Sequence, residues 1–314
     1  MLSKAEFRGG LLAGSAILLL ILAITAVSPG LPGEMLLQSL RFHLVIAGLG
    51  LAVLTILSGA RWRGLIVLLL VLASAAHGAM FVWDFYTRRT PIAAEPVAEF
   101  RFLSFNVLHG NRRSAELVDA VLADPPDVML VMETSGISAH MDRLMAQFPY
   151  RVGCDNPQTC DISLYSRFPI TDGQITRLPP FRFERMVTGR INVDGQDITI
   201  AGVHLSKPYF DQASWAELHT INRVLSDIEG PLVLAGDFNA APWSEPLAML
   251  GNRQELIPAP WPIATWPVRL GALGVPIDNA FTRGNARLLT LESGDSYGSN
   301  HRPLWADVAI YPQP

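Results

Sequence analysis

A short apolar segment that ends in polar residues is the first indication of chemistry in this sequence. Residues 232–235 are expected to form a buried strand, and Gly236 then lets other backbone or a ligand approach closely. Asp237 and Asn239 follow, and an extended backbone would point both side chains to the same side. A carboxylate and an amide together could hold a metal-bound water molecule or a phosphate. Asp and Asn are also common turn residues, so a plain strand-to-turn junction is the alternative.

Other polar residues stand at the ends of other apolar segments. Taken singly, Asn106 could cap a turn, Glu133 could cap a helix, and His204 could be a satisfied core histidine. Buried polar groups are costly unless they share a wet site, so their repeated position favours a common site. Together they could supply a metal ligand, a base and a carboxylate that orients the base. The whole set is Asn106, Glu133, His204, Asp237, Asn239, Asp278, Asn300 and His301.

The segments that must position these residues alternate between strand and helix patterns. A long amphipathic helix is expected at 209–228, and Asp194-Gly195 is a strong hairpin signal. Many non-local strands with interspersed helices predict an α/β (α+β) domain of two packed sheets flanked by helices. Strands are expected at 101–108, 127–132, 161–166, 186–193, 196–204, 232–235, 277–282, 287–292 and 305–310, with shorter helices at 114–122 and 245–250.

Hydrophobic residues make up 50% of the chain and charged residues 17%, and the apolar excess is concentrated before residue 85. Three uncharged segments there, 10–27, 44–60 and 64–83, each have about the length that crosses a bilayer as a helix. We therefore predict a membrane anchor over 1–85 with the lipid bilayer as partner, a linker over 86–98, and a catalytic domain over 99–314.

Basic residues around these segments are divided four against three. The slight excess on the side of the first residues favours a cytoplasmic N-terminus. Three crossings would then place the domain on the periplasmic or extracellular side of a bacterial cytoplasmic membrane. The larger group is Lys4, Arg8, Arg61 and Arg63, and the smaller one is Arg41, Arg88 and Arg89.

The two cysteines and the charge of the domain bear on its surroundings. Cys154 and Cys160 are separated by a turn-like spacer, which favours a disulfide in an oxidising compartment. A zinc site is the alternative, although no histidine lies beside them. Residues 99–314 contain 17 Lys+Arg and 24 Asp+Glu, a net charge of −7, so they have no general attraction for polyanions.

Seven segments of the domain resemble the endonuclease/exonuclease/phosphatase superfamily and occur in its order. This resemblance implies a four-layered sandwich of two β-sheets flanked by helices, hydrolysis of a phosphoester, and divalent metal, Mg²⁺ or Mn²⁺. The segments are 102–107 (FLSFNV), 127–133 (DVMLVME), 162–170 (ISLYSRFPI), 202–205 (GVHL), 234–239 (LAGDFN), 277–278 (ID) and 299–303 (SNHRP).

On this resemblance we assign Glu133 as principal metal ligand, with Asn106 contacting metal or phosphate. His301 would be the general base, oriented by Asp278. Asp237 would hold the attacking water or assist at the leaving group.

The remaining assignments concern the phosphate. Asn239 would hydrogen-bond it, and His204 would bind a phosphoryl oxygen and stabilise the transition state. Arg190 is a further candidate for a phosphate contact.

One position departs from the family pattern, which has Asp directly before the last His. The residue here is Asn300, whose amide would remove a negative charge next to the predicted metal. We expect an active enzyme with altered metal demand, and a non-catalytic membrane scaffold or receptor is the alternative. The substrate stays open between nucleic acid, a phospholipid headgroup and a small phosphoester, and no obligate protein partner is evident. Loop 252–276 with Trp261 and Trp266 is expected to influence that choice.

Overall fold

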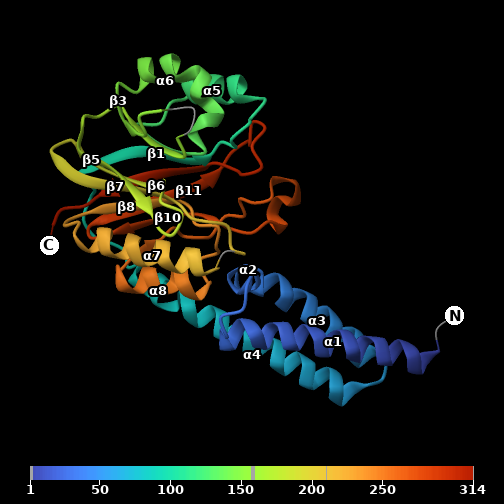
Figure 1. The fold of residues 1–314 in the computed structure, drawn as a ribbon. Coiled ribbons are helices and arrows are strands. Elements are labelled where there is room, and N and C mark those ends of the chain that lie inside the picture. The colour runs from blue at the N-terminus through green and yellow to red at the C-terminus, as the bar shows by residue number, and fades with distance from the viewer. Residues whose placement is uncertain (1–2, 157–159, 210, 314) are drawn as a thin grey trace.

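The computed structural model describes residues 3–156, 160–209 and 211–313. In these residues, two six-stranded β-sheets lie face to face, and helices cover the outer face of each (Figure 1). Further helices project from one side of this sandwich. The predicted layers of helix, sheet, sheet and helix are therefore present.

The first sheet has the strand order β11-β12-β1-β2-β4-β3. β1 and β2 are parallel, with Asn106 opposite Met132, so the ends of both strands meet at one edge of the sheet. This register places Glu133 directly beyond the partner of Asn106. The bounds are β1 Ala98–Asn106, β2 Val128–Met132, β3 Tyr150–Gly153, β4 Ile162–Ser166, β11 Ala286–Ser293 and β12 Leu304–Ile310.

The second sheet has the order β5-β6-β7-β8-β10-β9. β7 and β8 are parallel, with His204 opposite Asp237, and β10 runs antiparallel to β8 so that Asp278 also lies opposite Asp237. Three predicted site residues therefore share one sheet edge. The bounds are β5 Ile170–Leu178, β6 Phe183–Val193, β7 Gln196–His204, β8 Leu232–Asp237, β9 Ile257–Pro258 and β10 Asp278–Arg283.

Three apolar clusters hold the layers together. Phe102, Leu130 and Val233 belong to the central cluster between the sheets. α5 (Ser114–Ala123) packs its buried Leu117 on the outer face of the first sheet, and α6 (Met141–Gln147) covers the same face. α7 (Asp211–Ser226) and α8 (Glu245–Arg253) cover the second sheet.

The structure contains several elements that the sequence pattern did not indicate. β3, β5 and β9, the 3₁₀ helix η1 (Thr134–His140) and α6 were all missed, as was η2 (Val268–Leu273). β5 lies at the edge of its sheet and has mostly exposed or half-buried residues, so no apolar alternation marks it.

Two helices are long and apolar enough to cross a membrane, judged by length and composition: α1 (Lys4–Val27) and α4 (Arg61–Arg88). The predicted middle segment, 44–60, forms the shorter α3 (Arg41–Leu57), whose crossing stays a prediction. α3 and α4 pack closely, because a Cβ on Gly48 would lie 2.7 Å from Val71. α4 continues past residue 83, so the predicted linker begins inside a helix.

The apolar helices are bonded to the domain as well as joined to it by the chain. Phe85 of α4 is fully buried and packs against Phe281 of β10. Short helix α2 (Glu34–Ser39) provides a second contact, where Trp243 Nε1 donates to the carbonyl oxygen of Ser39 at 3.1 Å. Helices and domain therefore form one packed unit.

Cys154 and Cys160 form the predicted disulfide, and both are buried. The backbone beyond Cys160 is hydrogen-bonded to the segment after β2, since the amide of Ser135 donates to the Cys160 carbonyl at 3.3 Å. The disulfide loop therefore lies beside Asp161 and the loop that carries Glu133.

Gly236 is a position where the fold excludes a side chain. Its φ is +140°, and a Cβ would lie 1.9 Å from the carbonyl oxygen of Val203 in β7. The close approach of β7 and β8 beside the candidate site depends on this glycine.

We expect Gly236→Ala to lower the free energy of unfolding by about 3 kcal/mol or more. The added Cβ would force the backbone of β7 and β8 apart, or the clash would remain as strain in the folded protein. Denaturant unfolding of the purified protein measures the change. Gly110→Ala is the matched control, since no atom lies within 4 Å of its Cβ position. Equal stability of the two variants would contradict the packing argument.

Candidate active site

Asp237, at the end of β8, occupies the centre of the candidate site and is 1% exposed. Its Oδ2 accepts a hydrogen bond from Asn106 Nδ2 at 3.1 Å. The same oxygen is 3.6 Å from His204 Nε2 and 3.8 Å from His301 Nε2. One buried carboxylate oxygen therefore faces both histidines and an amide from the opposite sheet.

Asp278 and His301 form the predicted pair. Oδ2 of Asp278 lies 2.9 Å from Nδ1 of His301, and both side chains are buried. Ser299 fixes the backbone there, because its Oγ accepts from the His301 amide at 3.1 Å and donates to the Asn106 carbonyl at 2.6 Å. His301 Nε2 is thereby directed toward Asp237.

The charges around His301 alter its protonation. Burial alone would lower its pKa, but the negative charges of Asp278 and Asp237 outweigh burial and raise the pKa to about 9. For Asp237, burial and then the charge of Asp278 raise the pKa. The metal-free site therefore favours a protonated His301.

His204 has a carboxylate partner that the sequence reasoning missed. Its Nδ1 lies 2.8 Å from Oδ2 of Asp161, and Arg185 Nε is 3.1 Å from the same oxygen. Burial would lower the pKa of His204, but Asp161 outweighs it and the pKa is raised. Asp161 comes directly after Cys160 and before a strand, and this strand-edge position was the available signal.

Asn106 and Glu133 lie side by side at the edge of the first sheet, as predicted. Asn106 Nδ2 donates to Oε1 of Glu133 at 3.2 Å, in addition to its bond to Asp237. The backbone amide of His109 donates to the other Glu133 oxygen at 2.5 Å. Glu133 has a left-handed backbone conformation, φ 54°, which turns the chain at the end of β2.

Asn239 and Asn300 differ from expectation in conformation and exposure. The extended backbone does not continue, because Asn239 has φ 49° and its Nδ2 donates to the Leu205 carbonyl at 2.8 Å. The side chains of Asp237 and Asn239 therefore do not share one face of an extended strand, although the backbone amide of Asn239 donates to Asp237 Oδ1 at 2.9 Å. Asn300 is exposed beside the buried His301.

Arg190 does not lie at the site, and its predicted phosphate contact is wrong. It pairs with Thr199 of β7, five residues before His204, and forms an ion pair with Asp172 at 3.7 Å. At about 3.3 Å per residue this is roughly 16 Å from the site. β6 begins three residues earlier than predicted, so Arg185 is the β6 arginine that reaches the site.

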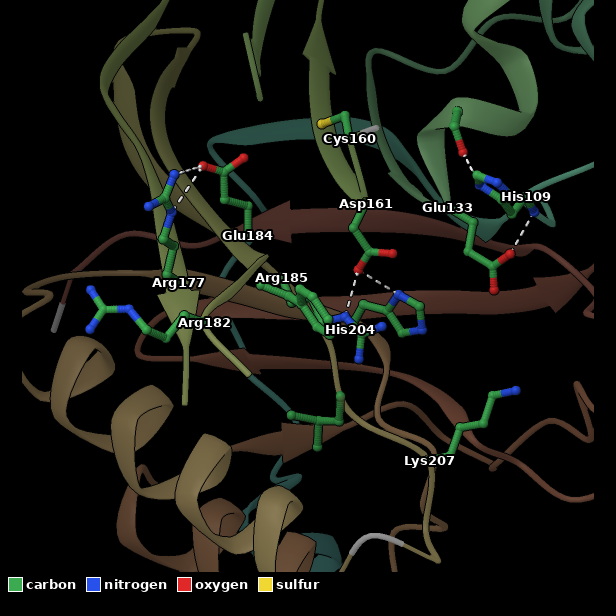
Figure 2. A pocket seen from close by; sticks show the side chains of 13 residues that line it. His109, Glu133, Cys160, Asp161, Arg177, Arg182, Glu184, Arg185, His204 and Lys207 are labelled. Atoms are coloured by element: carbon green, nitrogen blue, oxygen red, sulfur yellow. Dashed lines mark hydrogen bonds and ion pairs between the residues drawn. The ribbon is translucent and has the colours of Figure 1, made fainter. Parts of the chain in front are cut away.

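A cavity of about 520 Å³ opens beside these residues (Figure 2). Glu133 and His204 border it, so it continues directly from the buried cluster. Arg177 is paired with Glu184 at 2.8 Å, and the side chain of Lys207 points toward the side of the cavity where Glu133 lies. The basic lining residues are His109, Arg177, Arg182, Arg185, His204 and Lys207.

The buried donors suit a hard divalent cation. Ligating atoms of Asp237, Asp278 and His301 all lie within 4.8 Å of one another. Oδ1 of Asp278 is buried without a hydrogen-bond partner in the described part of the chain, which leaves an anionic oxygen to be satisfied. Carboxylate oxygens favour Mg²⁺ or Mn²⁺. Asn106 connects Glu133 to this group, because its amide nitrogen donates to both Glu133 and Asp237.

Comparisons with known proteins identify a matching family and a curated relative. The model of the Endonuclease/Exonuclease/phosphatase family matches residues 103–301. A UPF0294 protein from Vibrio cholerae is 26% identical over 227 residues, which cover 66% of this chain and 76% of the relative.

Solved structures show the same fold. D. rerio TDP2 complexed with single strand DNA product has a TM-score of 0.58 at 13% identity, covering 68% of this chain and 99% of that one. Sphingomyelinase C from Streptomyces griseocarneus has a TM-score of 0.50 at 16% identity, covering 69% and 99%. At such identities the likeness concerns the fold alone.

The raised pKa of His301 predicts how the stability of the metal-free protein depends on pH. Protonated His301 stabilises the folded protein. This contribution is complete below the usual histidine pKa of 6.5 and is lost as pH rises through about 9. We expect the free energy of unfolding to fall by about 3 kcal/mol over this range. Unfolding in detergent with a chelator measures it. His301→Gln should show a clearly smaller fall, and an identical pH dependence would contradict the assignment.

Proposed function

Because this chain belongs to the Endonuclease/Exonuclease/phosphatase family, we propose that it is a membrane-anchored, divalent-metal-dependent phosphoester hydrolase. The observation that carries the proposal is the buried arrangement in which Asp278 holds His301 with Nε2 facing Asp237. A histidine oriented by a carboxylate in this way is suited to take a proton from water.

The proposed reaction begins with proton transfer to His301. Its Nδ1–H donates to Asp278, so the neutral ring keeps Nε2 free to accept a proton from the attacking water. Asp237 is placed to hold that water, since its Oδ2 is 3.8 Å from the same nitrogen. A divalent cation held by Glu133 and the neighbouring carboxylates would offset charge on the phosphoryl oxygens and oppose the charges that raise the pKa of His301.

On the other side of Asp237, His204 would bind the phosphate. Asp161 raises the pKa of His204 against the effect of burial, and the protonated ring can donate to a phosphoryl oxygen as negative charge develops. The amide of Asn239 is a further phosphate donor in this proposal, whereas Asn106 uses both of its amide hydrogens to hold Glu133 and Asp237. Water forms the new P–O bond, the ester P–O bond breaks, and the leaving oxygen takes up a proton.

The proposed membrane attachment rests on α1 and α4. Trp62 and Trp83 of α4 are 80% and 68% exposed, and they are 21 positions apart, which corresponds to about 31 Å along a helix. Exposed tryptophans about one bilayer thickness apart are typical of a membrane-crossing helix. We place the chain in a bacterial cytoplasmic membrane with the domain outside, where a Cys154–Cys160 disulfide would persist.

We expect the purified chain to hydrolyse bis-p-nitrophenyl phosphate only with a divalent metal, and His301→Ala to lower kcat by about 10³-fold or more through loss of the base. Release of p-nitrophenol measures both. His219→Ala is the matched control, because His219 is exposed on α7. No turnover with Mg²⁺ or Mn²⁺ would favour a scaffold role.

Asn300→Asp is expected to tighten Mg²⁺ binding by about tenfold, since it adds a negative charge next to His301 and the metal-binding carboxylates. The concentration of Mg²⁺ that gives half-maximal turnover measures the change. Unchanged metal demand and rate would show that the amide at this position is irrelevant to the metal.

A further inference from the structure

Residues 265–275, called the rim loop here, connect the catalytic pair to the apolar helices. The two ends of the loop are held together, because the Trp266 amide donates to the Val275 carbonyl at 3.1 Å and the Val275 amide donates back at 2.6 Å. η2 forms the tip between them. This loop includes Trp266, one of the two tryptophans in the segment that is expected to influence substrate choice.

One side of the rim loop is bonded to the site. Thr265 Oγ1 accepts from the Asp278 amide at 3.2 Å, and its carbonyl accepts from the Arg302 amide at 3.0 Å. The Val268 amide donates to the Asn300 carbonyl at 3.2 Å. The loop therefore holds both neighbours of His301 and the backbone of its carboxylate partner.

The other side of the rim loop packs on the apolar helices. Trp266 and Val275 share an apolar cluster with Leu40 and Phe42, which lie where α3 begins. His43 Nε2 donates to the carbonyl oxygen of Leu273 at 3.0 Å. The tip of the loop is therefore level with the first turn of α3.

The tip of the rim loop presents apolar side chains to its surroundings. Leu270 is 50% exposed and Leu273 is 70% exposed. Ile46, one turn beyond His43 on α3, is 66% exposed, so the apolar surface of the helix begins where the tip lies. Figure 1 shows the orange segment that carries η2 projecting on the side of the domain from which the helices extend.

Charge at the tip agrees with a lipid surface. Arg269 is exposed directly before Leu270, and the Arg302 guanidinium lies 4.0 Å from the Cβ position of Gly271. Leucines that enter a bilayer beside arginines that meet phosphates are typical of interfacial segments.

We propose that the rim loop docks on the bilayer through Leu270 and Leu273, so that His301 acts on phosphoesters presented by lipid headgroups at the membrane surface. This inference rests on the proposed hydrolase function and membrane attachment. The domain is acidic overall, so a polyanion in solution is poorly attracted, whereas a lipid headgroup reaches the site by lateral diffusion.

Docking is tested by placing a fluorescent label on the full chain in nanodiscs of phosphatidylethanolamine and phosphatidylglycerol. The native cysteines are paired, so Leu273→Cys supplies a single reactive thiol. Glu229→Cys is the matched control. Glu229 lies just before β8 begins, whereas Asp237 lies where that strand ends, so Glu229 is far from the site. Doxyl-labelled lipid should quench the label at 273 at least threefold more than at 229. Equal quenching would overturn the docking.

The substrate is tested with the double variant Leu270→Ser and Leu273→Ser. Release of phosphorylated headgroups from vesicles of the same lipids should fall about tenfold, while bis-p-nitrophenyl phosphate hydrolysis stays unchanged. Leu289→Ser, an exposed leucine of β11, should change neither. An unchanged lipid rate, or no lipid hydrolysis by a chain that cleaves the chromogenic diester, would overturn the inference. Failure on both substrates would instead overturn the hydrolase function, while label quenching would still decide docking.

Discussion

The buried carboxylate of Asp237 is the constraint on which the rest of the site depends. A charge removed from water is costly unless partners surround it, and here Asn106 and two histidines do so. Asp278 adds a second buried negative charge opposite Asp237, and the pair raises the pKa of His301. The site is therefore electrostatically incomplete without protons or a cation, which is the condition that a metal-dependent hydrolase requires.

The sandwich provides this arrangement through the pairing of its strands. Two parallel pairs, β1 with β2 and β7 with β8, end at the site, and antiparallel β10 begins there. Each strand terminus delivers a polar side chain without interrupting the core behind it. Gly236 permits the close contact of β7 and β8 that places His204 beside Asp237. The apolar cluster between the sheets keeps both edges in register.

The apolar helices are joined to this machinery by packing. Phe85 is buried beneath the second sheet, and α2 bonds to Trp243. Through the rim loop, α3 reaches the backbone on both sides of His301. The domain therefore keeps a fixed orientation relative to its helices, so access to the candidate site depends on how those helices are placed.

The sequence by itself determined the fold class, most strand positions and the residues Asn106, Glu133, His204, Asp237, Asp278 and His301, because apolar segments ending in polar residues are local patterns. Tertiary structure alone decided which carboxylate serves each histidine. Asp161 meets His204 across 43 positions, and the antiparallel register of β6 with β7 places Arg185 near Asp161 while Arg190 lies opposite Thr199. The sequence likewise could not predict the bent conformation of Asn239 or the contact of the rim loop with α3. Hydrogen bonds between distant segments leave no periodic pattern in the chain.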